Sequence, residues 1–596
     1  MFQILKKHIE DPGKYLFTGM FFLAFFLYFA LFNSYTLSYQ EQIQLFRFSQ
    51  DYFTEFLNRP GGMLSYLNSF IVQFFISPLA ASLIITFSGF LGYLLSASLL
   101  RLHNVKEKIW PFLIALIILS LHSDYTYSFV NTLGYVSALG FTAFYISFGN
   151  NKLRYIAGSI LIIPLILFSG FFAVLALLLW ILHETANTKA RYRFYIPAGY
   201  LIVAFLIPYI IWHQIFDIPL LNSISSPLLL PGNSISLYSL VLLFAFLPVI
   251  LLLSVAIPYY KKVSGRTKAG RYVIIALRTA AVLIFVILIL KFSYSPKNEL
   301  IFKMDNKVQH KEWDEVTGLA SKFKEPDRMV AHFTNLALYN SGKLGDELFR
   351  YNPADQSFLW LSYPEVRYPY FFGSDIFYQL GYINKAYAWA YDGMIGTGAS
   401  PRLVKQLSLI SLINGNLTLA GKYLEMLDQS LFYRKWSAMY LNYLANPDLI
   451  SKDQEIVSKR NLAIHADFNG DTSIPDSILV HLLQNHPDNK MAYEYFLSTL
   501  LLEKNISDFT WYVNDLNKYG YNAIPVHFEE ALLINMYYTR KNVIPEGHSI
   551  RQSTSARFDK FMNLYSSRKA DNKLNEEFGN TYWYYFYFLN KKAQVR

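Results

Sequence analysis

The chain has 596 residues, of which 53% are hydrophobic, and its mean hydropathy is +0.23. This composition excludes an ordinary soluble protein, because nearly all the long uncharged runs lie in residues 15–291. Residues 297–596, in contrast, have the composition of a soluble domain. The net charge of +11 arises entirely in residues 1–296, with 20 Lys and Arg against 9 Asp and Glu, so no nucleic-acid partner is expected. Without cysteine, disulfides, thiolate metal sites and a Cys nucleophile are excluded.

Six runs are clear candidates for membrane spans, because a span needs about 20 apolar residues. They are 15–37, 80–100, 128–148, 195–213, 236–256 and 272–291. The first run is too long for a signal-peptide core and lacks a small-x-small cleavage site, so we expect a retained anchor. Residues 110–122 are short for a span, and residues 155–183 are long but interrupted by Pro164, Ser169 and Gly170.

Basic clusters predict how these runs cross the bilayer, because Lys and Arg beside spans stay cytoplasmic. The clusters are Lys6, Lys7 and Lys14; Arg101, Lys106 and Lys108; Lys152 and Arg154; Lys189, Arg191 and Arg193; and Lys261, Lys262, Arg266, Lys268 and Arg271. All five fall on one side only if 110–122 crosses once and 155–183 crosses twice as a hairpin. The pattern predicts a polytopic bundle of about nine spans, with a cytoplasmic N-terminus and residues 297–596 outside.

The first outer loop, residues 38–66, contains the stretch RFSQDYFTEFLNR at 47–59. Its apolar residues cover one face of a helix, which predicts a helix lying along the membrane interface. The four charged residues follow each other at i,i+4 steps: Arg47, Asp51, Glu55 and Arg59. An arginine one turn away lowers the pKa of a carboxyl group, whereas a general base needs a raised or tuned one. We therefore favour a charge ladder over catalysis for Asp51 and Glu55.

Other ionisable residues on the outer side are stronger candidates for chemistry. Glu41 lies just after the first span and has no basic partner at helical spacing, while His122 and Asp124 lie in the short second outer loop, LHSDYTYS. Asp217 begins a long outer loop without Lys or Arg. Ionisable residues at such positions are functional candidates when they face a cavity. The chain carries no P-loop, Rossmann GxGxxG, HExxH or GxSxG motif, so no cofactor is identified.

The C-terminal half repeats at 34 residues. GYINKAYAWA begins at Gly381 and GNLTLAGKYL at Gly415, and Ala386 and Ala420 are also 34 apart. This period, with a small residue where paired helices approach, is typical of a tetratricopeptide repeat. We expect an all-α fold in two domains, a transmembrane domain at 1–296 and an α-solenoid at 297–596. An irregular all-α domain is the alternative for the second. The aromatic tail TYWYYFYFLN (581–590) is expected to cap it, or to rest on the membrane surface.

The membrane half resembles a GT-C type glycosyltransferase in layout, with its many spans, an amphipathic first outer loop and acidic residues after span one and in the second outer loop. Glu41 and Asp124 match those two places. The resemblance implies that Glu41 or Asp51 activates the acceptor or binds a divalent metal, that His122 and Asp124 assist, and that the donor is a polyprenyl-phosphate sugar.

The C-terminal half is similar to an uncharacterised bacterial family of polytopic membrane proteins, through YQLGYINKAYAWA, SPRLVKQLSLISLINGN and LFYRKW. That resemblance implies a bacterial cytoplasmic membrane protein whose second domain is periplasmic. Two functions stay open. One is a glycosyltransferase at the outer face of the membrane. The other is a non-catalytic envelope scaffold whose repeat domain binds a protein or peptide.

Overall fold

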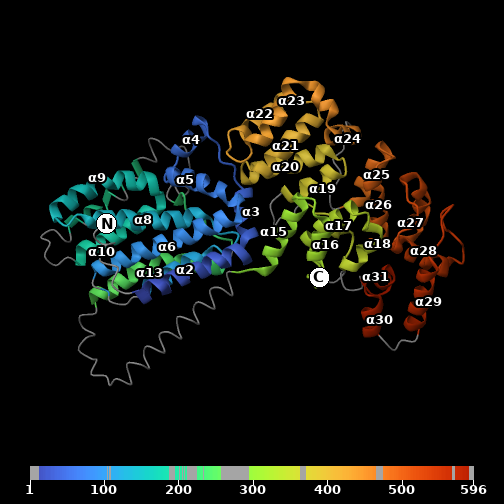
Figure 1. The fold of residues 1–596 in the computed structure, drawn as a ribbon, viewed down its shortest axis with the longest axis horizontal. Coiled ribbons are helices and arrows are strands. Elements are labelled where there is room, and N and C mark those ends of the chain that lie inside the picture. The colour runs from blue at the N-terminus through green and yellow to red at the C-terminus, as the bar shows by residue number, and fades with distance from the viewer. Residues whose placement is uncertain are drawn as a thin grey trace, which may run out of the picture. The chain divides into compact units, whose positions relative to one another are not determined.

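The computed structural model describes most of the chain as helices joined by short turns (Figure 1). The described residues are 12–103, 105, 109–186, scattered positions between 195 and 210, 225–232, 234–256, 294–362, 371–464, 474–566 and 571–589. No strand occurs among them, which confirms the all-α class. The chain divides into two compact units, Met1–Glu299 and Leu300–Arg596, close to the composition break at Pro296.

Unit 1 is built from apolar helices. They are α2 (Pro12–Phe32), α3 (Ser34–Gln42), α4 (Gln50–Leu57), α5 (Gly62–Val72), α6 (Pro78–Leu102), α7 (Trp110–Leu121), α8 (Phe129–Ser147), α9 (Asn151–Ser169), α10 (Ala173–Ala186) and α13 (Ser234–Ala256). Helix α6 begins where Ser77 accepts a hydrogen bond from the Ala80 N–H and Pro78 occupies the first turn, a frequent arrangement at helix starts.

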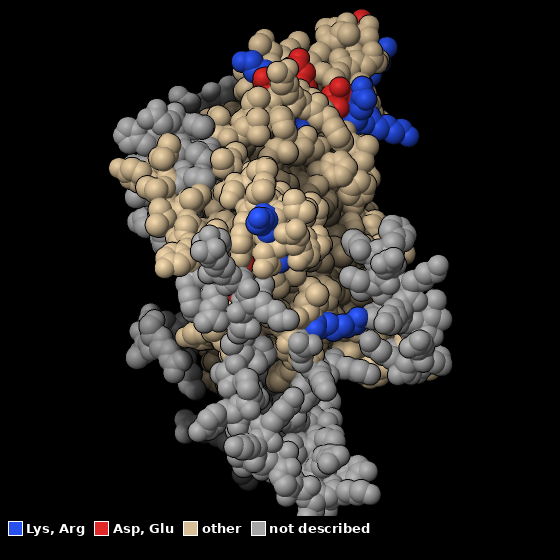
Figure 2. All heavy atoms as spheres, turned by 90° about the vertical axis from the view of Figure 1, so that its left-hand side faces the viewer, with Lys and Arg blue, Asp and Glu red and all other residues tan. Residues whose placement is uncertain are grey.

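Four helical stretches among the described residues are long and apolar enough to cross a membrane. They are Tyr15–Phe32, Pro78–Leu102, Phe129–Ser147 and Asn151–Ala186; Trp110–Leu121 and Ser236–Leu252 are apolar but shorter. In the view of Figure 2, most of the described surface is neither basic nor acidic, as lipid contact requires. The predicted span 272–291 lies outside the described residues, and 195–213 is described only at scattered positions.

Residues 151–186 fold back on themselves. Arg154, near the start of α9, and Glu184, near the end of α10, form a salt bridge with Nε and Oε1 2.6 Å apart. In one continuous helix these residues would be separated by about 45 Å, so the chain must reverse between them. The reversal occurs at Gly170, whose φ of +54° is unfavourable for other residues. This is the hairpin geometry that the charge pattern predicts.

The contacts sort the helix ends of unit 1 into two groups. Arg154 and Glu184 meet the Tyr145 hydroxyl at the end of α8, and His103, just after α6, lies 3.3 Å from His183 of α10. We call this group the ion-pair end. At the opposite end of these helices lie the loops that follow α2, α7 and α9 and the loop that precedes α13. We call this second group the α3 end.

The predicted interfacial helix is shorter than the 47–59 stretch. Helix α4 begins at Gln50, because the Ser49 hydroxyl accepts a hydrogen bond from the Tyr52 N–H. Arg47 therefore precedes the helix and binds Glu55, with Nη2 and Oε1 3.5 Å apart, instead of Asp51. The predicted ladder is wrong in its first step, since a capping serine ends the helical spacing on which the ladder depends.

Unit 2 is a succession of helices packed against their sequence neighbours. They are α15 (Pro296–Gln309), which begins in unit 1, α16 (Trp313–Ala320), α17 (Arg328–Asn340), α18 (Leu344–Glu347), α19 (Phe371–Gln379), α20 (Ile383–Thr397), α21 (Pro401–Ile413), α22 (Leu417–Asp428), α23 (Arg434–Ala445), α24 (Gln454–Leu462), α25 (Pro475–Asn485), α26 (Lys490–Leu502), α27 (Ile506–Tyr512), α28 (Val526–Thr539), α29 (Gln552–Ser566), α30 (Asp571–Phe578) and α31 (Tyr582–Phe588).

One turn recurs between the paired helices. Among the described residues of unit 2, five α-helices are followed, two residues after their last residue, by a residue with positive φ. The next N–H then bonds to the carbonyl five residues back, as in a Schellman motif. The positive-φ residues are Lys311, Gly342, Gly381, Gly415 and Lys504. Two of them are the glycines of the 34-residue period.

The two alanines of the period are also equivalent in the structure. Ala386 and Ala420 are the fourth residues of α20 and α22, and both are fully buried. Each of these helices packs against the helix that precedes it, α19 or α21. The period therefore corresponds to two successive helix pairs.

The aromatic tail packs inside unit 2. Tyr582, Trp583 and Tyr585 are buried, and helix α31 lies against α28. The Lys504 ammonium donates hydrogen bonds to the carbonyls of Phe586 and Leu589, so it satisfies the end of α31. This is the packing expected of a closing helix, and not of a tail lying on a membrane.

Candidate functional site

Helix α3 carries Glu41 and is fixed at its N-terminus by an acidic side chain from the end of unit 1. The Glu299 carboxylate accepts hydrogen bonds from the Tyr35 N–H (2.9 Å), the Thr36 N–H (2.8 Å) and the Thr36 hydroxyl (2.7 Å). A carboxylate at this position satisfies free N–H groups and interacts favourably with the helix dipole. Glu41 follows near the other end of α3, and its side chain is buried.

The loop of residues 122–128 lies against α3. The Asn33 amide donates to the His122 carbonyl (3.2 Å), and the Gln40 amide donates to the Tyr127 carbonyl (2.9 Å). The ring of Tyr39 meets the ring of Tyr125, with centroids 5.9 Å apart. These three contacts run along α3 from its beginning to the residue before Glu41. The structure therefore brings the helix of Glu41 together with the loop of His122 and Asp124.

Asp124 is buried, and its two carboxylate oxygens are in different situations. Oδ1 accepts hydrogen bonds from the N–H and the hydroxyl of Thr126, both at 2.9 Å. Oδ2 has no hydrogen-bond partner in the described structure. The Thr126 hydroxyl accepts a bond from the Gly232 N–H (3.0 Å), so the loop before α13 also supports this carboxylate. One oxygen holds Asp124 in place while the other is left for a ligand or water.

His122 is fully buried at the end of α7. Its Nε2 lies 2.8 Å from the hydroxyl of Thr132, which also lies 3.0 Å from the Tyr127 hydroxyl. Its Nδ1 has no hydrogen-bond partner in the described structure. A neutral imidazole can donate from one nitrogen and accept at the other.

Asn33 adds a third unsatisfied atom to this group. Its amide nitrogen is bonded to His122, whereas its Oδ1 is buried without a partner in the described structure. Buried polar atoms without partners are rare, and they mark places where water or a ligand is expected. Asn33, His122 and Asp124 thus lie where the start of α3 meets the 122–128 loop, and each has one buried side-chain atom without a partner in the described structure. We call these three residues the α3 cluster.

Asp51 lies apart from the α3 cluster. It is exposed in the first turn of α4, a helix that packs on α5 through Tyr52 and Phe56. No contact in the described part of the chain joins Asp51 to Glu41, His122 or Asp124. In the described residues no group of three or more His, Cys, Asp or Glu could hold a metal ion. A metal held by Glu41 or Asp51 with fewer protein ligands stays a prediction.

The loops around the α3 cluster are joined to one another by backbone bonds. The Gly61 N–H donates to the Leu167 carbonyl (3.0 Å), and the Phe171 N–H donates to the Ser226 carbonyl (2.8 Å). The Asn131 amide donates to the Leu229 carbonyl (2.6 Å) and accepts from its N–H (3.1 Å). Spacing in the sequence could not show these contacts. The short run of polar residues after the first span, NSYT at 33–36, was the signal available for Asn33.

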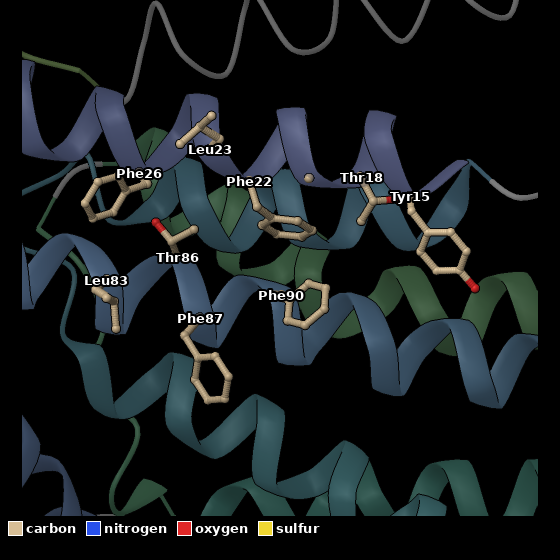
Figure 3. A pocket seen from close by; sticks show the side chains of 10 residues that line it. Tyr15, Thr18, Phe22, Leu23, Phe26, Leu83, Thr86, Phe87 and Phe90 are labelled. Atoms are coloured by element: carbon tan, nitrogen blue, oxygen red, sulfur yellow. The ribbon is translucent and has the colours of Figure 1, made fainter. Parts of the chain in front are cut away.

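An apolar groove runs along α2 and α6, the first of which leads into Asn33 (Figure 3). Its volume is about 500 Å³, and its lining includes Phe22, Phe26, Leu83, Phe87 and Phe90. The rings of Phe22 and Phe90 close one part of it, with centroids 5.1 Å apart. Phe26 lies roughly 10 Å along the helix from Asn33. The groove therefore offers an apolar surface that ends near the α3 cluster.

Comparison with known proteins gives a family and no activity. No curated protein matches the chain, and no solved structure does. A model described as a family of unknown function (DUF6057) matches residues 12–589, which is nearly the whole chain and includes both units. The chain therefore belongs to this family of unknown function, DUF6057.

Proposed function

We propose that the protein is a membrane glycosyltransferase whose site, at the α3 cluster, opens to the outer face and uses a lipid-linked sugar. The observation that carries the proposal is the meeting of α3 with the 122–128 loop, in which the Asp124 Oδ2 and the His122 Nδ1 are both buried without a hydrogen-bond partner in the described structure. A buried carboxylate oxygen without a hydrogen-bond partner is suited to accept a proton from an acceptor hydroxyl.

The distribution of charge supports an outward site. Arg101 and Arg154 lie at the ion-pair end, as do the first residues of α9. Basic residues beside spans favour the cytoplasm. The α3 end, on the other side of the same helices, is then the outer end. This assignment agrees with an N-terminus inside and with the second unit outside the cytoplasm.

The apolar groove supports a lipid-linked donor. A polyprenyl phosphate has a long apolar chain, and the groove along α2 and α6 is lined almost wholly by hydrocarbon. Because α2 continues into Asn33, a chain in this groove would lead its phosphate toward the α3 cluster. In this proposal Asp124 accepts the proton of the acceptor hydroxyl, and Glu41 and His122 orient the reacting groups.

The proposal is tested by deleting the gene for this protein in its native cell. The deletion strain is then complemented with the wild-type or a variant gene. Mass spectrometry of envelope glycans and lipid-linked sugars should show a missing glycan and an accumulated donor in the deletion strain, both corrected by the wild-type protein. Glu41→Gln should restore neither, although the protein is inserted at wild-type level. Full restoration by Glu41→Gln contradicts its assigned role, and an unchanged glycan and lipid profile on deletion contradicts the enzyme itself.

A second candidate function is a scaffold, favoured by the recurring turn of unit 2. Five helix ends with the same Schellman geometry are what a tetratricopeptide-like solenoid would contain, and such solenoids bind proteins or peptides on their concave surface. Crosslinking in intact cells discriminates the two candidates. A scaffold predicts a stable protein partner that is retained when Glu41 and Asp124 are replaced, together with an unchanged pool of lipid-linked sugar in the deletion strain.

A further inference from the structure

Apolar side chains are exposed at one corner of unit 2, where α22 is followed by α23. Leu431 is 50% exposed and Phe432 is 38% exposed in the turn between these helices. Ile395, close to the end of α20, is 68% exposed. Large apolar side chains are unfavourable on a surface that faces water. Where several are exposed together, they mark an interaction site.

Helix order places these residues at the same end of the packed helices. Consecutive helices from α20 to α23 pack against one another and are joined by short turns. The end of α20, the start of α21, the end of α22 and the start of α23 therefore lie together. The Lys405 ammonium of α21 confirms this, since it lies 4.5 Å from the ring centroid of Tyr433 and 5.3 Å from that of Trp436.

Basic and aromatic residues surround the exposed apolar ones. Helix α23 begins with Arg434 and Lys435, both exposed, followed by the half-buried Trp436. Arg434 has one acidic neighbour, Asp428, with Nε and Oδ1 3.6 Å apart, and an exposed pair of this kind is weak. We call Ile395, Leu431, Phe432, Arg434, Lys435 and Trp436 the α23 corner.

We infer that the α23 corner docks on the surface of an anionic lipid bilayer. Aliphatic and aromatic tips enter the boundary between headgroups and acyl chains, Trp favours that boundary, and Lys and Arg are attracted to anionic lipids. Unit 1 of the same chain carries helices long enough to span a membrane, which keeps a bilayer at high effective concentration.

The chain has no cysteine, which permits a direct test with single-cysteine variants of the full-length protein. Leu431→Cys would carry an environment-sensitive fluorophore in nanodiscs of phosphatidylglycerol and phosphatidylcholine. Ile474→Cys is the matched control, because Ile474 is 47% exposed in unit 2 and lies outside the corner. Lipids with a spin label at the level of the first acyl carbons would serve as quenchers.

Docking predicts that the probe at 431 shifts to shorter emission wavelength and is quenched by the labelled lipid, whereas the probe at 474 is not. Replacing Arg434 and Lys435 by Glu should lower the ratio of molecules with a docked corner to molecules with an undocked corner. The expected decrease is at least about fivefold for each basic residue removed. Nanodiscs of phosphatidylcholine alone should weaken docking in the same direction.

Three results would overturn the inference. The first is the absence of lipid quenching at 431 while the labelled protein keeps its helical circular dichroism and remains monodisperse. The second is a probe at 431 that is shielded from water but not quenched by lipid, because a protein surface or a second copy would then cover the corner. The third is equal quenching at 431 and 474, because docking would then not be specific to the corner.

Discussion

Among the described residues, each unit buries one arginine, and the two arginines are held differently. In unit 1, Arg154 forms a two-pronged pair with Glu184 alone, and its remaining donors bond to the Phe148 carbonyl and to Asn151. In unit 2, Arg402 lies between two carboxylates, those of Asp305 and Asp375. The first pair closes one hairpin, whereas the second joins helices from three different helix pairs, α15, α19 and α21.

The difference shows where each unit concentrates its polar interactions. In unit 1 the ion pair stands at one end of apolar helices, where it fixes α9 against α10 within a single segment of chain. In unit 2 the charged group lies inside the packed helices and fixes segments about 100 residues apart in sequence (Asp305 and Arg402). Loss of a charge should therefore act locally in unit 1 and across several helix pairs in unit 2.

Arg402→Met should have the largest effect, because it leaves the buried Asp305 and the half-buried Asp375 without their shared cation. Breaking a buried pair typically costs 3–5 kcal/mol, and with two partners we expect about 5 kcal/mol. Hydrogen exchange in the full-length protein should speed up in α15, α19 and α21 together while α9 and α10 are unaffected. Faster exchange confined to α21 would show that the three helices are not coupled through Arg402.

Glu184→Gln should have the second largest effect. We expect it to lower the free energy of unfolding by about 4 kcal/mol, because Arg154 is then buried without a counter-charge. The change should lower the thermal unfolding midpoint in detergent and speed up exchange in α9 and α10. The double variant Arg154→Met with Glu184→Met removes both charges and should recover much of the loss. A double variant as unstable as the single one would mean that the salt bridge itself stabilises the hairpin.

Acid should destabilise unit 2 through His332. At pH 5 the free energy of unfolding should be lower than at pH 7 by on the order of 2 kcal/mol. His332 is buried, and desolvation lowers its pKa from 6.5 to about 4. The unfolded state therefore binds more protons below pH 6.5, and stability falls as the pH drops from 6.5 toward 4. Denaturant unfolding at pH 7 and pH 5 should show this loss, and His332→Gln should reduce it. An equal loss in the variant would assign the acid sensitivity to other groups.

The smallest effect is expected for Glu55→Gln, which should change the free energy of unfolding by less than about 1 kcal/mol. Glu55 is 61% exposed, and its contact with Arg47 at 3.5 Å is a surface pair. The thermal midpoint should change little and should be insensitive to salt. A loss comparable to that of Glu184→Gln would contradict the view that exposed and buried ion pairs of unit 1 differ in strength.

The hairpin at 155–183 and the helix pairs around Gly381 and Gly415 could be predicted because each has a signal along the chain. The rule that basic residues beside spans stay on one side predicts a reversal within 155–183, where the chain turns at Gly170, and the 34-residue period matches two equivalent turns. The α3 cluster could be predicted only in part. Glu41, His122 and Asp124 are recognisable as ionisable residues near spans.

The rest of the α3 cluster leaves no such signal. Asn33 reaches the His122 carbonyl, and Gly232 reaches the Thr126 hydroxyl, across about 90 and 106 residues of sequence. Bonds to backbone groups place no constraint on residue type at the carbonyl, so spacing cannot show them. Helix α4 illustrates the same difficulty on a smaller scale, because the Ser49 cap alone removes Arg47 from the helix.

The rate of glycan transfer in membranes containing Asp124→Asn shows whether Asp124 is the proton acceptor of the proposed reaction. Asparagine keeps the oxygen that Thr126 binds and replaces the unsatisfied Oδ2 by an amide, so the fold should survive while the proton acceptor is lost. The rate should fall about 10²–10⁴-fold. Asp314→Asn, which replaces an exposed carboxylate in unit 2, should keep the wild-type rate. A wild-type rate for Asp124→Asn would contradict the claim that this carboxylate performs the chemistry.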